Sequence, residues 1–298
     1  MRKKNIYLAY NISIETSLFL IGFNEVKSRT DICYFLIVDH NLKTLHHLNT
    51  FPSENPYCEI KPDSAIISWR KSITYKIDFI NKIISVYKEE ILPEVDYSLS
   101  LNYVLSIICY QNSILPIHGA CLKNKNNKCI VIIGHSSIGK STLTAKLLDN
   151  NWSFISEEMT ALDIINSKII PYGGGVYVRL KNLDIIKTSN EVGNDFKLFV
   201  SDVEKHCIWK KNWMCSYDNN EINAIIFLAN SKTMSFNKLN FTEALYLLTQ
   251  NIYAPTTINK SLATHFLKPI TKICSKTNCY LYSFEKYPST SFLNNYVF

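Results

Sequence analysis

Short runs of β-branched and aromatic residues alternate with turn-forming residues over the first hundred positions of the chain. Such runs are typical of β-strands. The pattern predicts five strands, at Ile6–Tyr10, Cys33–Val38, Ala65–Trp69, Ile73–Ile77 and Ile83–Tyr87. No cluster of catalytic residue types accompanies them, so we expect a small β-rich domain without an active site of its own.

The pattern changes near Asp96, where the apolar residues Leu101, Val104, Leu105 and Ile108 follow the spacing of a helix. We therefore expect two domains, 1–95 and 96–298. In the second, the apolar runs predict strands at Ile117–Leu122, Cys129–Ile133, Phe154–Ser156, Ala161–Ile165, Ala224–Ala229 and Cys279–Phe284. Helices are predicted at Lys140–Leu148, Thr242–Gln250 and Leu262–Ile273. Strands and helices that alternate in this way indicate an α/β fold.

Composition supports a globular protein that binds an anionic ligand. The 298 residues are 47% hydrophobic and 19% charged, which excludes a disordered chain or a fibre. The net charge of +7 comes from the second part, because residues 1–100 carry 12 basic and 12 acidic side chains. This excess suits a nucleotide, but it is too small and too dispersed for nucleic-acid binding.

Two further features of the sequence bear on the cellular compartment of the protein. The nine cysteines form no C-x-x-C pair, which favours a reduced chain. The polar residues Asn11, Ser13 and Glu15 interrupt the apolar segment that a signal peptide would need, and no apolar run reaches membrane-spanning length. We expect a cytoplasmic protein with no membrane partner.

Six of the eight glycines lie between Gly119 and Gly175, and two of them belong to a complete G-x-x-x-x-G-K-S motif from Gly134 to Ser141. An apolar strand precedes the motif and a helix-forming stretch follows it, as in a P-loop. The loop amides and the start of the helix would bind phosphate, the Lys140 ammonium would bridge the outer phosphates, and the Ser141 hydroxyl would coordinate Mg²⁺. The expected nucleotide-binding residues are Gly134, Ser136, Ser137, Ile138, Gly139, Lys140, Ser141 and Thr142.

Two adjacent carboxylates, Glu157 and Glu158, end a short apolar strand seventeen residues after Lys140. Phosphoryl transfer to a hydroxyl needs one carboxylate to accept the proton, and the metal usually needs another. Upstream, His118 lies beside Gly119 on the strand expected to pair with the P-loop strand. This histidine is either a core residue or an orienting partner for the carboxylates.

The stretch LPIHGACLKNKNNKCIVIIGHSSIGKSTLTAKLLDNNWSFISEE resembles the catalytic domain of HPr kinase/phosphorylase and its relatives. That domain has the order His-Gly, strand, P-loop, helix and acidic pair. The chain is most similar to the HPr-kinase-like proteins of modified-peptide (RiPP) clusters, including lasso peptide kinases, which phosphorylate a serine of the precursor. Ile170-Pro171, Arg179-Leu180 and Tyr280-Leu281-Tyr282 extend the likeness. Glu157-Glu158 replaces the usual Asp-Asp pair, and the run Gly173–Gly175 is particular to this chain.

The resemblance implies an α/β fold with a P-loop domain of the HPr-kinase/PEP-carboxykinase-like type behind the β-rich domain. It also implies that Glu157 is the general base, that Glu158 joins Ser141 in binding Mg²⁺, and that His118 orients the acidic pair. Arg179 would neutralise the transferred phosphoryl group or hold the substrate, or it is a surface arginine. The glycine run is either a loop over the site or a wide turn.

The expected activity is ATP- and Mg²⁺-dependent transfer of a phosphoryl group to a serine-type hydroxyl of a peptide or protein, in peptide natural-product maturation. The β-rich domain is expected to be the platform for that peptide. Two alternatives stay open: a small-molecule alcohol kinase with the same fold, and a nucleotide-binding regulatory protein. Because relatives form oligomers, assembly with further copies of the chain is also expected.

Overall fold

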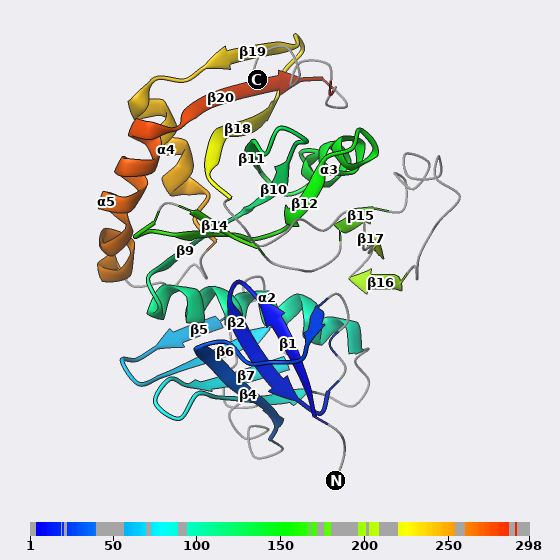
Figure 1. Ribbon diagram of the computed structural model, residues 1–298, viewed down its shortest axis with the longest axis vertical. Helices are drawn as coiled ribbons and strands as arrows, with labels where there is room; N and C mark the ends of the chain where they lie inside the picture. The colour runs from blue at the N-terminus through cyan, green and yellow to red at the C-terminus, as the bar shows by residue number, and fades with distance from the viewer. Residues whose placement is uncertain are drawn as a thin grey trace. The chain divides into compact units, whose positions relative to one another are not determined.

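The computed structural model describes residues 4–18, 20, 23–39, 57–69, 73–88, 94–166, 168–171, 176–179, 196–200, 203–208, 220–253, 260–285 and 290. Mixed sheets with a few helices make the chain an α/β protein (Figure 1). Its contacts divide it into two compact units. The first consists of residues 1–112 and 254–265, and the second of residues 113–253 and 266–298.

An eight-stranded mixed sheet forms the first unit, with strand order β3-β1-β2-β4-β8-β7-β6-β5. The strands β2, β4 and β8 run parallel, and every other pair is antiparallel. All five strands predicted from the sequence are present within one residue, whereas β2, β3 and β5 were not predicted. The bounds are β1 (Asn5–Ala9), β2 (Ile12–Thr16), β3 (Asn24–Val26), β4 (Ile32–Val38), β5 (Tyr57–Ile60), β6 (Ser64–Trp69), β7 (Ile73–Asp78) and β8 (Ile83–Lys88).

Helix α2 (Glu94–Gln111) groups with this first unit, whose first segment ends at Asn112. The helix packs on β6 and β7, and the hydroxyls of Tyr75 and Ser100 lie 2.7 Å apart across that contact. The change in periodicity at Asp96 therefore marks the start of a helix that packs on the strands before it.

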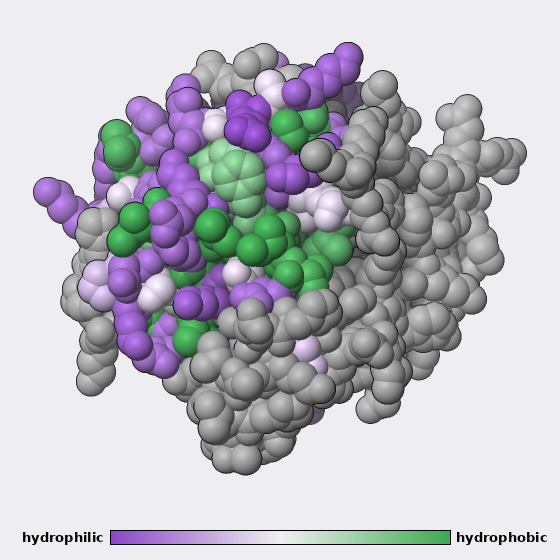
Figure 2. Space-filling view, turned by 90° about the horizontal axis from the view of Figure 1, so that it is seen from below, coloured by the Kyte–Doolittle hydropathy of each residue, from purple (hydrophilic) through white to green (hydrophobic). Residues whose placement is uncertain are grey.

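Pairing along β1, β2, β4 and β8 brings Ile6, Glu15, Phe35 and Ile83 into one row on one face of the sheet. Glu15 pairs with the amine of Lys4 and the guanidinium of Arg29, and both cations lie over the Phe35 ring. Figure 2 views the molecule from below and shows apolar side chains gathered among polar ones.

A six-stranded sheet organises the second unit, in the order β12-β10-β11-β18-β20-β19. The central strands β11, β18 and β20 are parallel, and the outer strands β10 and β19 are antiparallel to their neighbours. This arrangement buries the apolar runs of β11 and β18 on both faces. The bounds are β10 (Gly119–Lys123), β11 (Cys129–Ile133), β12 (Ser153–Ser156), β18 (Ile222–Asn230), β19 (Ser235–Lys238) and β20 (Asn278–Phe284).

Three helices accompany these strands in or partly in the second unit: α3 (Lys140–Asp149), α4 (Phe241–Gln250) and α5 (Lys260–Lys276). Asn240 caps α4 by accepting a hydrogen bond from the Glu243 amide, while the Glu243 carboxylate accepts one from the Asn240 amide. All three helices were predicted to within three residues at each end. None of the described helices is long and apolar enough to cross a membrane.

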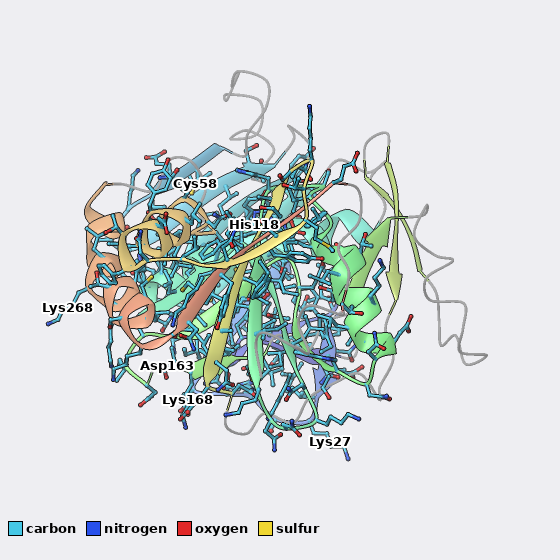
Figure 3. All side chains as sticks on the ribbon, turned by 90° about the horizontal axis from the view of Figure 1, so that it is seen from above. Lys27, Cys58, His118, Asp163, Lys168 and Lys268 are labelled. Atoms are coloured by element: carbon cyan, nitrogen blue, oxygen red, sulfur yellow. The ribbon has the colours of Figure 1, made fainter. Side chains whose placement is uncertain are left out.

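Two three-stranded sheets complete the unit. One has the order β14-β13-β9, with β9 (Ile114–Ile117), β13 (Thr160–Asp163) and β14 (Lys168–Ile170); the other has the order β15-β17-β16, with β15 (Val176–Arg179), β16 (Phe196–Val200) and β17 (Val203–Ile208). The predicted strand Ala161–Ile165 ends early because the Asp163 carboxylate accepts the amides of Ile165 and Asn166 and closes a turn. Asp163 and Lys168 then lie opposite each other (Figure 3).

Candidate functional site

Strand direction brings the sequence-predicted groups to one edge of the six-stranded sheet. Strand β10 is antiparallel to both β11 and β12. The carboxyl ends of β11 and β12 therefore meet beside the start of β10. The P-loop motif follows β11, the acidic pair follows β12, and His118 directly precedes β10, so one edge receives all three.

The P-loop motif forms a tight connection between β11 and α3. The Ile138 amide donates to the His135 carbonyl at 3.3 Å, which closes a turn. Ser137 and Gly139 have left-handed φ values of 69° and 114°, and the value at Gly139 is one that side chains rarely adopt. Ser136 and Ser137 are exposed, so the loop is open to a ligand from solvent.

Lys140 begins α3, and its side chain turns back over the loop. The Nζ atom donates to the carbonyl oxygens of Gly134 at 2.6 Å and His135 at 3.1 Å. The residue is only 7% exposed, so the ammonium is held at the loop rather than free in solvent. A phosphate bound to the loop would meet a cation that is already in place, together with the positive end of the helix dipole.

Ser141 and Glu157 are joined directly. The Ser141 hydroxyl donates to Oε1 of Glu157 at 2.6 Å, a short distance typical of hydrogen bonds to carboxylates. Glu157 is 2% exposed, whereas Ser141 is half-buried. This hydrogen bond connects the first turn of α3 to the acidic turn that follows β12. The first carboxylate of the pair therefore lies next to the P-loop motif.

Glu158 occupies a strained turn. Its φ is 68°, and the Met159 amide donates to the Glu157 carbonyl at 2.9 Å, which makes a γ-turn of the rarer, positive-φ form. Such backbone costs about 1–3 kcal/mol and is concentrated at functional sites. Glu158 is half-buried. The turn therefore separates the two carboxylates, with Glu157 buried against the P-loop and Glu158 more accessible.

His118 lies in the break between β9 and β10, where the chain passes from one sheet to the other. Its amide donates to the Asn251 carbonyl at 2.7 Å, and its ring packs edge-on against Tyr253 at 5.7 Å between ring centres. The label of His118 in Figure 3 marks this position. The predicted single strand Ile117–Leu122 is thus two strands, because Ile117 pairs with Thr160 and Gly119 pairs with Ile133.

Arg179 is the last residue of β15, where it pairs with Lys205 of β17. Strand β15 contacts α3, which puts this part of the backbone near the P-loop helix. The run Gly173–Gly175 lies outside the described residues, and so does the side chain of Arg179. Their expected roles stay predictions.

Ser141 and Glu157 fit a magnesium ion in donor type, because Mg²⁺ prefers hydroxyl and carboxylate oxygens. No group of three or more His, Cys, Asp or Glu side chains that could hold a metal occurs among the described residues. Mg²⁺ commonly binds through one or two protein oxygens when the phosphates of a nucleotide and water supply its remaining ligands.

Ser156 and Thr160, which flank the acidic turn, were missed from the sequence. The Ser156 and Thr160 hydroxyls lie 2.9 Å apart, and Thr160 Oγ1 donates to the Gly119 carbonyl at 2.9 Å. Neither residue belongs to the P-loop motif or to the acidic pair. The one available signal was a hydroxyl residue on each side of the segment Glu157-Glu158-Met159.

No protein-family model matches the chain, and no curated protein matches it in sequence. Among solved structures it is similar to the Hpr(Ser) kinase/phosphatase from Coxiella burnetii, with 13% identity and a TM-score of 0.30. The match covers 59% of this chain and 82% of that chain. Similarity at this level does not establish a shared activity, and the HPr-kinase-like family stays a prediction.

Proposed function

We propose that the chain is an ATP- and Mg²⁺-dependent kinase that phosphorylates a serine-type hydroxyl of a peptide or protein. The observation that carries the proposal is the 2.6 Å hydrogen bond from Ser141 to Glu157. It joins the hydroxyl that a P-loop offers to magnesium with a carboxylate from a separate strand. A P-loop that only bound phosphate would not need this carboxylate.

Ser141 and Glu157 are the residues that would hold Mg²⁺ beside the nucleotide phosphates. Bound there, the ion would neutralise the charge of the transferred phosphoryl group. This assignment exchanges the roles expected from the sequence, where Glu158 was given to the metal and Glu157 to the proton. The burial of Glu157 against Ser141 and the greater accessibility of Glu158 support the exchange.

Glu158 is then the general base. The acceptor oxygen attacks the γ-phosphorus of ATP, the bond from that phosphorus to the bridging oxygen of ADP breaks, and the hydroxyl proton passes to the Glu158 carboxylate. Lys140 bridges the phosphates during this step. The resemblance gives His118 the role of orienting the acidic pair, and Arg179 would contribute charge from β15.

The acceptor class rests on the first unit, whose strands β3 and β5 are the two edges of an eight-stranded sheet. An extended peptide can add to such an edge through main-chain hydrogen bonds. A peptide held there would bring its serine to the kinase at a raised effective concentration. Maturation of a peptide natural product is the setting that the sequence resemblance suggests for such a reaction.

The test incubates the full-length chain with γ-labelled ATP, Mg²⁺ and one of three acceptors: peptides ending in serine, free serine, or water alone. Mass spectrometry then identifies any phosphorylated product, with Lys140→Ala as the negative control. Phosphopeptide formation that needs Lys140 supports the proposal. Equal phosphorylation of free serine would favour a small-molecule kinase, and nucleotide binding without any transfer would favour a regulatory protein.

A further inference from the structure

Two chain crossings lie side by side at the candidate site. The chain passes from the three-stranded sheet to the six-stranded sheet at His118, between β9 and β10, and it passes back between β12 and β13. The second crossing is the acidic turn, residues 157–159. Glu157 and Glu158 therefore lie at a point where neither sheet's ladder of hydrogen bonds fixes the backbone.

Two side-chain hydroxyls, from Ser156 and Thr160, hold the backbone where the sheet hydrogen bonds do not. Thr160 Oγ1 donates its one proton to the Gly119 carbonyl at 2.9 Å, so the Ser156 hydroxyl must be the donor in the 2.9 Å contact between the two side chains. The direction is therefore Ser156 to Thr160 to Gly119. Both hydroxyl residues are fully buried, and they are the last residue of β12 and the first of β13.

The backbone is closely packed at Gly119, where the pair of hydroxyls ends. A Cβ atom at Gly119 would lie 2.7 Å from the Ile132 carbonyl oxygen, so the backbones of β10 and β11 approach closely there. Gly119 pairs with Ile133, the last residue of β11 before the P-loop motif. The two hydroxyls thus tie the acidic turn to the first residue of β10, which pairs with the end of the strand before the P-loop motif.

We propose that Thr160, together with Ser156, is a positioning residue that holds the acidic turn against the P-loop. The inference rests on the proposed kinase function for its catalytic consequence. The two hydroxyls keep Glu157 within reach of Ser141 and offset the backbone strain at Glu158. Without the Thr160 hydroxyl, the Gly119 carbonyl and the Ser156 hydroxyl would lose their partner in a buried place, and the turn would relax.

The experiment compares three variants of the full-length chain. Thr160→Val removes the hydroxyl and keeps the shape, and Thr160→Ser restores the hydroxyl. Thr144→Val is the matched control, because Thr144 is also fully buried but its hydroxyl has no hydrogen-bond partner in the part of the chain that the structure describes. Hydrogen–deuterium exchange of the segment 154–162 reports the turn directly, whether or not the chain is a kinase.

In Thr160→Val, exchange in this segment should rise about tenfold, while Thr160→Ser and Thr144→Val stay within about twofold of the parent chain. Binding of a fluorescent ADP analogue without Mg²⁺ should not change, since the P-loop is intact. Phosphotransfer turnover should fall by about 10–100-fold, the usual loss when a group that orients a metal ligand is removed. Thr160→Ser should recover it.

Unchanged exchange in Thr160→Val would overturn the positioning role, and so would equal effects of Thr160→Val and Thr144→Val. Faster exchange with full turnover would also overturn it, because the turn would then not need to be held. Failure of the proposed function gives a different result. In that case the parent chain itself binds no nucleotide or transfers no phosphoryl group, while the exchange data still decide whether Thr160 holds the turn.

Discussion

Ser141→Ala gives the sharpest test of the pairing between the P-loop and the acidic turn. A hydrogen bond to a charged group contributes about 1.5–3 kcal/mol, and Glu157, at 2% exposure, has little water to replace the lost donor. We therefore expect Ser141→Ala to lower the free energy of unfolding by about 1.5–3 kcal/mol. Glu157→Gln removes the buried charge to which Ser141 donates. Adding it to Ser141→Ala should therefore restore about half or more of that loss.

The unfolding free energy of the second unit can be followed through Trp152, which lies in the core beside α3. Replacing Trp69, Trp209 and Trp213 by Phe leaves Trp152 as the single tryptophan, and its fluorescence then reports unfolding in urea titrations. Ser141→Ala and Glu157→Gln should each weaken Mg²⁺-dependent nucleotide binding, although Glu157→Gln should raise the stability of the Ser141→Ala variant. The reasoning would be refuted if Ser141→Ala left the free energy of unfolding unchanged. It would also be refuted if the double variant were less stable than Ser141→Ala alone.

The remaining predictions concern the other groups at the site and the division of the chain. Lys140→Ala should reduce turnover by at least about a hundredfold with an unchanged circular dichroism spectrum, and near-normal turnover would remove the P-loop from the mechanism. Glu158→Gln should reduce turnover by about 10²–10⁴-fold while Mg²⁺-nucleotide affinity stays within about twofold, whereas equal small effects at Glu157 and Glu158 would favour a solvated acidic turn. A chain beginning at Asp96 should aggregate, because it keeps α2 without β6 and β7. A chain beginning at Ser113 should stay soluble, bind ATP and show a raised KM for a peptide acceptor, as measured by light scattering and kinetics.

Local apolar patterns were sufficient to predict most of the described elements. Cys129–Ile133 and the helix at Lys140 were predicted almost to the residue, because a five-residue apolar run before a P-loop motif has few other conformations. The run Ile117–Leu122 was read as one strand, since periodicity along the chain does not reveal which sheet each half joins. The apolar pattern likewise does not reveal the packing partners of α2, because β6 and β7 lie earlier in the sequence.

The parts of the candidate site that follow a sequence motif could be predicted. The parts that depend on backbone geometry and strand order could not. The P-loop motif, the acidic pair and His118 are predicted from residue type and order, and the structure brings them to one edge of the six-stranded sheet. The left-handed φ of Glu158 had no sequence signal, because glutamate rarely adopts it. The hydrogen bond between Ser141 and Glu157 depends on how the strands are ordered, which spacing along the chain does not give.

Strand order also bears on the length of the side chain at position 157. Strand β10 lies between β11 and β12, and neighbouring strands are about 4.8 Å apart, so the acidic turn starts about 10 Å from the P-loop strand. Ser141 lies on α3, which contacts β10, and the Glu157 carboxylate reaches its Oγ from the far side of that strand. Aspartate is one methylene shorter, and removing one carbon–carbon bond of about 1.5 Å would open the 2.6 Å contact beyond hydrogen-bonding distance unless the turn moved. Because Thr160 Oγ1 donates to the Gly119 carbonyl and so holds that turn, the length of the glutamate side chain is what lets residue 157 pair with Ser141 without a move of the backbone.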